Sequence, residues 1–271
     1  MHFSKMQSSG NNFVIIDNIN QNFIISKKDI ILLSNSNYGI GFDQIILLNP
    51  IYKNNFDFSY RIYNSDGNEV NQCGNGAICT SDFVIKKKLT NKKIIKFKTL
   101  DSFLKTEFIK KSFFKVNMGI PYFKNESNCI KNLKLSLRKN KNFINFYFVL
   151  VKNPHIIIIV RKVENKIFKK YSKIISLSCS CFLEVNVTFA QILNKKKIYL
   201  KTYERGVGET KSCGSAACAA VFSCIKNKLL TNIIIHAVFP GGTSLVRYNV
   251  KDKNIYLIGK SNHVFEGYIK I

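Results

Sequence analysis

Residues 72–79 read Gln-Cys-Gly-Asn-Gly-Ala-Ile-Cys, and residues 212–218 read Ser-Cys-Gly-Ser-Ala-Ala-Cys. A Cys-Gly followed by small residues therefore occurs twice, 140 positions apart. Two structural cysteines, a metal site or a pair of reacting thiols are each compatible with this pattern. The segments that surround the two Cys-Gly pairs help to distinguish these alternatives.

These surrounding segments are copies of one another. When the sequence is shifted by 140 positions, nine identities fall within the 27 residues 63–89, Cys73 on Cys213 among them. Further aligned pairs are Tyr63 with Tyr203 and Glu69 with Glu209 at this offset, and Asn11 with Asn153 and Gln44 with Asn186 at an offset of 142. Self-similarity of this kind predicts two copies of one α/β unit, related by a pseudo-two-fold axis.

Local patterns predict the same elements in each copy. Residues 58–63 and 197–203 have strand character, and a glycine-bearing loop follows each of them. Residues 77–88 and 216–228 lack Gly and Pro, which predicts helices that begin just after each Cys-Gly. Other strand-like segments are residues 94–99, 113–118, 143–151 and 255–259. We expect an α/β (α+β) fold of two pseudo-symmetric domains, each a strand-rich layer or barrel wrapped on a central helix.

The length of 271 residues accommodates two such domains of roughly 120 to 150 residues. We expect one domain to comprise residues 1–117 plus 259–271 and to carry Cys73. The other comprises residues 118–258 and carries Cys213. Gly119-Ile120-Pro121 is the expected hinge between the halves, and the polar, Lys-rich residues 125–142 are an expected surface connection.

Composition and hydropathy exclude several protein classes. Hydrophobic residues make up 46% of the chain, which is enough for packed cores and excludes a disordered chain. No apolar run approaches the ~18 residues of a membrane span, and the first ten residues contain no apolar signal core. We therefore expect a cytoplasmic protein without a membrane partner.

The net charge of +26 suggests a nucleic-acid-binding protein as one hypothesis. The basic residues, however, are 37 Lys and 5 Arg, whereas readers of phosphates and bases favour the planar fork of Arg. Lys, Asn and Ile are abundant together, which is typical of drift in an AT-rich genome. We expect a solvated Lys-rich surface that adheres weakly to polyanions, and no specific nucleic-acid partner.

We expect no secretory signal, and the eight cysteines are therefore predicted to be mostly reduced thiols. The sequence contains no Cys-x-x-Cys pair, and its four His form no ligand cluster, so we expect no metal. Six cysteines are not paired by the repeat and are interpreted as small hydrophobic residues: Cys79, Cys129, Cys179, Cys181, Cys218 and Cys224.

A cysteine just before a helix lies at the positive end of the helix macrodipole, where its thiolate is stabilised. The pKa of such a thiol is expected to fall from ~8.5 toward neutrality. The same helix start also binds a carboxylate. Two thiols across one bound carboxylate would place an acid and a base on opposite faces of the attached carbon. This arrangement predicts stereoinversion by proton transfer, whereas two buried structural cysteines would not require equivalent positions.

From the first residues to the last, the motifs resemble those of the diaminopimelate epimerase family. The matching motifs are residues 1–6 with 10–14, Asn64-Ser65-Asp66-Gly67-Asn68-Glu69, Cys73-Gly74-Asn75-Gly76, Asn153-Pro154-His155, residues 204–210, Cys213-Gly214-Ser215 and Pro240-Gly241-Gly242. The resemblance implies a diaminopimelate epimerase-like fold and an isomerase that needs no pyridoxal or other cofactor. It also implies interconversion of LL- and meso-diaminopimelate, for lysine and peptidoglycan synthesis, by an enzyme that is usually a homodimer.

The resemblance also implies roles for individual residues. Cys73 and Cys213 would be the acid/base pair, with His155 and Glu204 as auxiliary polar residues beside the thiols. The donors to the reacting α-carboxylate would be Gly74, Asn75, Gly214 and Ser215. The residues lining the pocket and holding the substrate would be Asn11, Gln44, Asn64, Asn153, Asn186, Glu204 and Arg205. Arg205 suits a distant carboxylate, and Asn side chains both donate and accept, as an amino-acid head group requires.

Some positions depart from the family pattern: Ile78 stands for a usual Arg, Asn68 for Ser, Ala216 for Gly and Lys152 for Gly. None of these changes removes a residue assigned to proton transfer. A proline racemase, which shares the two-thiol plan, is the nearest alternative, and Asn75 with Glu204-Arg205 favours the diaminopimelate enzyme. A Lys-rich polyanion-binding protein is the alternative from a different class, if the catalytic core has decayed.

Overall fold

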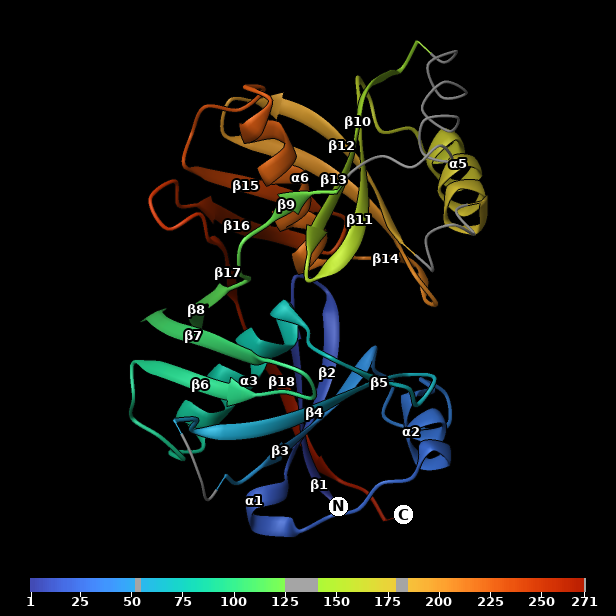
Figure 1. The fold of residues 1–271 in the computed structure, drawn as a ribbon. Helices are drawn as coiled ribbons and strands as arrows, with labels where there is room; N and C mark the ends of the chain where they lie inside the picture. The colour runs from blue at the N-terminus through green and yellow to red at the C-terminus, as the bar shows by residue number, and fades with distance from the viewer. Residues whose placement is uncertain (52–54, 125–140, 179–184, 271) are drawn as a thin grey trace. The chain divides into compact units, whose positions relative to one another are not determined.

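The computed structural model describes residues 1–51, 55–124, 141–178 and 185–270. The chain forms two compact units (Figure 1): unit 1 is Met1–Asn117 with Gly259–Ile271, and unit 2 is Met118–Ile258. The expected surface connection at 125–142 lies almost wholly outside the described residues. Cys129, Cys179 and Cys181 also lie outside them.

Unit 1 is a strand-rich layer around one helix, α3 (Gly74–Lys86). Its other helices are α1 (Asn18–Gln21) and α2 (Lys27–Ser34). Its strands are β1 (His2–Ser8), β2 (Asn11–Asp17), β3 (Gln44–Asn49), β4 (Phe58–Asn64), β5 (Glu69–Val70), β6 (Ile94–Lys98), β7 (Phe103–Lys110), β8 (Phe113–Asn117) and β18 (Asn262–Tyr268). They pair in the order β18-β1-β2-β3-β4-β6-β7-β8, with β5 on β4. Because β1, β2, β3, β7 and β8 all contact α3, this helix is the centre of the unit.

Unit 2 repeats this plan around helix α6 (Gly214–Lys226) and adds helix α5 (Asn165–Ser178). Its strands are β9 (Tyr122–Phe123), β10 (Phe143–Val151), β11 (Asn153–Val160), β12 (Asn186–Asn194), β13 (Lys197–Glu204), β14 (Gly208–Thr210), β15 (Ile234–Phe239), β16 (Gly242–Tyr248) and the first part of β17 (Ile255–Lys260). They pair in the order β9-β10-β11-β12-β13-β15-β16-β17, with β14 on β13. The predicted strand-rich fold with one central helix in each half is confirmed.

Equivalent strands pair in the same register within each of the two units. In unit 1, β2 and β3 are parallel with Phe13 opposite Gln44, and β4 and β5 place Tyr63 opposite Glu69. In unit 2 the equivalent pairs are His155 opposite Asn186 and Tyr203 opposite Glu209. Since these pairs differ by the same offsets of 142 and 140 found in the sequence, the internal duplication is confirmed down to single residues.

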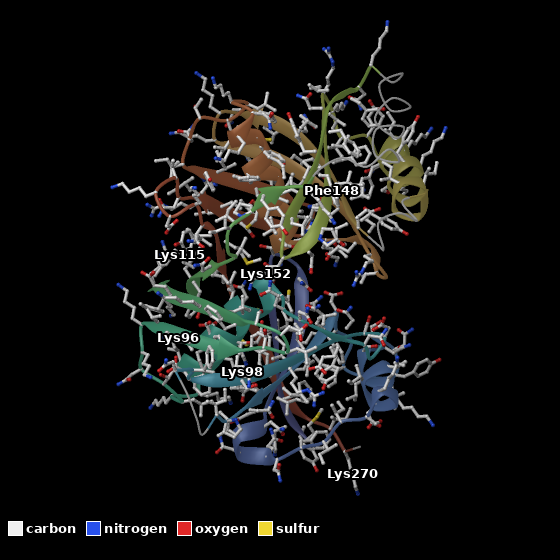
Figure 2. The ribbon with its side chains drawn as sticks, in the orientation of Figure 1. Lys96, Lys98, Lys115, Phe148, Lys152 and Lys270 are labelled. Carbon is white, nitrogen blue, oxygen red and sulfur yellow. The ribbon has the colours of Figure 1, made fainter. Side chains whose placement is uncertain are left out.

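The central strands are covered on both faces, which explains their continuous apolar runs. In unit 1, one face of β2 and β3 packs with α2 around Ile30 and Leu33, and α3 covers the other face. In unit 2, α5 covers one face with Phe168, and α6 covers the other. Phe148, labelled in Figure 2, belongs to the cluster beneath α5.

The outer strands of unit 1 are covered on one face only. Along β6, buried Ile95 and Phe97 alternate with exposed Ile94, Lys96 and Lys98. Figure 2 labels both of these lysines on the outer strand. The period of two therefore places the Lys-rich surface on the solvent face of the sheet.

Candidate active site

The first candidate thiol is Cys73, the N-cap of α3. Its backbone is extended, with φ −141° and ψ 123°, and its Sγ accepts a hydrogen bond from the Gly76 N–H at 3.4 Å. Asn11 at the start of β2 brings its Nδ2 to 3.9 Å from the same sulfur. The thiol therefore lies where the unpaired N–H groups of the helix start converge.

The neighbouring polar side chains come from the face of the sheet that packs on α3. Side chains alternate along a strand, and Ile45 faces the α2 cluster, so Gln44 and Asn64 face the α3 side. Gln44 donates from Nε2 to Asn64 Oδ1 at 2.8 Å across the β3–β4 pair. Asn75, in the first turn of α3, is buried. Unit 1 thus gathers Asn11, Gln44, Asn64, Gly74 and Asn75 around one helix start.

The second candidate thiol, Cys213, is the N-cap of α6, with φ −139° and ψ 115°. Its Sγ lies 3.4 Å from Ser215 Oγ, and the thiol is only 6% exposed. Burial raises the pKa of Cys213 well above its usual value, and the charge of Glu204 raises it further. Contacts with Ser215 and the Ala216 N–H act in the opposite direction but do not prevail.

The sequence-based expectation of a low thiol pKa at each helix start is therefore wrong for Cys213. A helix start does favour a thiolate, but desolvation penalises the charged form, and a nearby carboxylate repels it. At Cys213, desolvation and the Glu204 carboxylate together outweigh the helix start, so this thiol carries its proton at neutral pH. A buried, protonated thiol is suited to donate a proton to a bound substrate.

Glu204 and Arg205 lie at the turn between β13 and β14. Gly206 (φ 72°) and Gly208 (φ 95°) supply the left-handed backbone that this tight turn requires. The Arg205 N–H donates to Asn186 Oδ1 at 2.9 Å, which fixes the turn against the start of β12. Asn153, at the start of β11, is exposed.

His155 is a fully buried residue of β11, with 0% exposure, in register with Asn186. Neither ring nitrogen has a hydrogen-bond partner among the described residues. Burial lowers the pKa of His155 to about 3, so the ring is neutral at physiological pH. The neighbouring residues Ile156 and Val187 face the α5 cluster, and alternation therefore turns His155 to the α6 side with Cys213.

Two residues close to the thiols were not singled out from the sequence. Thr210 donates from Oγ1 to Glu204 Oε1 at 2.6 Å. Tyr60 is fully buried on β4, and its pKa is raised first by burial and then by the nearby Cys73. Thr210 is the last residue of the motif that begins with Glu204, and this position could have indicated its place in the site. No sequence pattern pointed to Tyr60.

The remaining described cysteines behave as small hydrophobic residues. Cys79, Cys218 and Cys224 are free thiols with 0% exposure. Burial raises the pKa of each, that of Cys224 to about 12. The predicted structural role is confirmed for these three residues.

Within the part of the chain that the structure describes, no three His, Cys, Asp or Glu side chains form a cluster able to hold a metal ion. Within the same part, every helix is too short or too polar to cross a bilayer.

The chain is similar to known proteins along its whole length. The sequence model of the diaminopimelate epimerase family matches residues 3–124 and 147–264. The diaminopimelate epimerase of Blochmanniella pennsylvanica is 41% identical over 286 residues and is aligned over all of both chains. That of Buchnera aphidicola from Acyrthosiphon pisum is 41% identical over 276 residues, covering 100% of this chain and 96% of the relative.

Solved structures with the same fold are more distant in sequence. A Bacillus anthracis phenazine biosynthesis protein of the PhzF family superposes with a TM-score of 0.72 at 14% identity, over 100% of this chain and 99% of the other. A hydroxyproline epimerase from Agrobacterium vitis superposes with a TM-score of 0.72 at 10% identity, over 98% and 91% of the two chains. At these identities the likeness describes the fold alone.

Proposed function

We propose that this chain, which belongs to the diaminopimelate epimerase family, inverts the α-carbon of its substrate with Cys73 and Cys213 as acid and base. The chain is an isomerase that interconverts LL- and meso-diaminopimelate, a step of lysine and peptidoglycan precursor synthesis. The observation that carries the two-thiol assignment is the duplication, which places one cysteine at the N-cap of each central helix. Each unit is accordingly one half of the enzyme.

The proposed reaction moves one proton across a stereocentre. The thiolate of one cysteine takes the α-proton, forming an S–H bond while the C–H electron pair stays on carbon. The opposing thiol then gives its proton to the other face of that carbon and becomes the thiolate. Since the pKa of Cys213 is raised by burial and by Glu204, Cys213 is the donor when Cys73 is the base. The roles exchange in the reverse direction.

Fixed donors around the α-carboxylate stabilise the carbanion that this step creates. We assign this task to the first turns of α3 and α6, through Gly74, Asn75, Gly214 and Ser215. Helix starts bind a carboxylate because their N–H groups are unpaired and their dipoles are aligned. The thiols and these donors account for the chemistry without a cofactor.

The substrate's other amino-acid head needs partners that accept from an ammonium group and donate to a carboxylate. We assign it to residues with both capacities and to one cation: Asn11, Gln44, Asn64, Asn153, Asn186, Glu204 and Arg205. The Arg205 guanidinium suits the distal carboxylate because its fork can bind both oxygens.

His155 and Glu204 are assigned auxiliary roles at Cys213. The Glu204 carboxylate raises the pKa of that thiol by its charge and by a hydrogen bond with it. The neutral His155 ring, which is buried without a partner among the described residues, retains hydrogen-bonding capacity for the bound substrate. We further propose that the enzyme is a cytoplasmic homodimer with no specific nucleic-acid or membrane partner.

Deuterium exchange tests the proposed function directly. In D₂O the wild-type enzyme should introduce deuterium at the α-carbon of diaminopimelate and interconvert its stereoisomers. Cys73→Ala and Cys213→Ala should each abolish epimerisation, because each removes the acid or base that we assign to one face. The matched control Cys218→Ala truncates another buried thiol of α6 and should stay active. Wild-type rates in both catalytic variants would contradict the proposal.

A further inference from the structure

We propose that Thr210 is a positioning residue whose hydroxyl holds the Glu204 carboxylate in place beside the Cys213 thiol. This inference rests on the proposed function and names one residue more for the same site. The starting observation is the short hydrogen bond of 2.6 Å from Thr210 Oγ1 to Glu204 Oε1. Hydrogen bonds from a hydroxyl to a carboxylate of this length are charge-assisted and orient the acceptor strongly.

The strand register explains why the hydroxyl meets the carboxylate. Thr210 of β14 lies opposite Thr202 of β13, and Glu204 lies two residues beyond Thr202 on the same face. Thr202 is fully buried and shares a hydrogen bond of 3.1 Å with the buried Thr188 of β12. Three threonines on adjacent strands therefore line the sheet face that supports Glu204. We call Thr188, Thr202 and Thr210 the threonine ladder.

The corresponding face of unit 1 is apolar. The residues equivalent to the threonine ladder are Ile46, Ile62 and Val70, at offsets of 142 and 140. Ile46 and Ile62 pack against the first turn of α3. A Cβ added at Gly76 would lie 3.2 Å from Ile46 Cδ1 and 3.3 Å from Ile62 Cδ1. Apolar side chains thus occupy these three positions of unit 1.

The hydroxyl-lined face of unit 2 and the apolar face of unit 1 lie beside different polar side chains. In unit 1 the residue equivalent to Glu204 is Asn64, a neutral side chain that accepts from Gln44 at 2.8 Å. In unit 2 the residue equivalent to Gln44 is Asn186, whose Oδ1 instead accepts from the Arg205 N–H. In unit 2 the Thr210 hydroxyl donates to the Glu204 carboxylate, a contact that the apolar Val70 of unit 1 cannot make.

The Lys201–Glu209 ion pair lies on the other face of these strands from Thr210 and Glu204. Lys201 and Glu209 form an ion pair of 2.6 Å with each other. Lys201 also lies over the ring of Phe168, which belongs to the α5 cluster, so this pair occupies the opposite face of the sheet. On the α6 side of β13 and β14, Thr210 is the hydroxyl that reaches Glu204.

The test compares Thr210→Val, which installs the residue type of unit 1, with Thr210→Ser, which keeps the hydroxyl. Thr210→Val should lower kcat/KM about 10-fold or more, because the Glu204 carboxylate loses the hydrogen bond that orients it. The acidic limb of its kcat/KM profile should move to higher pH, since a carboxylate that loses a hydrogen-bond donor is protonated more readily. Thr210→Ser should restore both the rate and the pH profile.

The matched control is Thr243→Val on the exposed face of β16, which should leave rate and pH profile unchanged. The inference is overturned if Thr210→Val keeps the wild-type rate and pH profile. It is equally overturned if activity and melting temperature fall together in Thr210→Val and Thr210→Ser, which indicates a purely structural role. Failure of the wild-type enzyme to epimerise diaminopimelate would instead refute the proposed function, so the two failures are distinguishable.

Discussion

Replacing His155 by Phe should make the protein more stable, most of all in acid. His155 is fully buried and both ring nitrogens lack a partner among the described residues. The equivalent residue of unit 1 is Phe13, also fully buried, so the framework accommodates a phenyl ring at this position. At neutral pH the substitution removes two unsatisfied polar atoms, each of which costs about 1–3 kcal/mol.

The pH dependence follows from the pKa of His155, which burial lowers from 6.5 to about 3. Between these two values the unfolded chain binds a proton that the folded chain excludes, so the folded state loses stability as pH falls. Each pH unit below 6.5 costs about 1.4 kcal/mol, which amounts to about 2.7 kcal/mol at pH 4.5. His155→Phe lacks this cost, and its advantage over the wild type should grow by that amount between pH 7.5 and 4.5.

Urea unfolding followed by circular dichroism at both pH values measures this difference. The matched control is His236→Phe, since His236 is exposed on β15, and it should leave the acid sensitivity unchanged. Epimerase activity of His155→Phe should fall at the same time, because the ring is assigned to the site. Equal acid sensitivity of wild type and His155→Phe would refute the reasoning.

Three further predictions concern the thiols and one turn. Glu204→Gln removes a charge that, together with burial, raises the pKa of Cys213, so iodoacetamide should label this thiol faster at neutral pH. The control Glu209→Gln should leave the labelling rate unchanged. An unchanged rate in Glu204→Gln would contradict the assigned cause. Mild oxidant should join Cys73 to Cys213 and stop turnover until a reductant is added; activity that survives complete oxidation is incompatible with facing thiols. Gly206→Ala places an L-residue at φ 72° and should lower the free energy of unfolding by about 1 kcal/mol, read as a shift of the urea midpoint; an unshifted midpoint speaks against strain at the turn.

Much of the fold could be predicted because the sequence contains an internal duplication. The offsets of 140 and 142 aligned Gln44 with Asn186 and Cys73 with Cys213, and the strand registers of both units agree with these offsets. Helices were expected from 77 and 216, and they begin at Gly74 and Gly214. The difference of two or three residues arises because glycine and asparagine have low helix propensity, although both are tolerated in the first turn.

The protonation of the thiols could not be predicted from local sequence. A cysteine at a helix start suggests a low pKa, yet the pKa of Cys213 is raised by burial and by Glu204, nine residues earlier in the chain. Both causes depend on tertiary packing. The supporting role proposed for Thr210 was hidden for the same reason, because only the β13–β14 register brings its hydroxyl to the carboxylate.

The central claim is that both cysteines act on one carbon, and a crystal structure with diaminopimelate bound tests it most directly. The two-thiol account predicts that the Sγ atoms of Cys73 and Cys213 lie on opposite faces of the same α-carbon, each within about 3–3.5 Å of it. Sulfur atoms that lie in separate cavities, with only one of them near the substrate, would contradict the account.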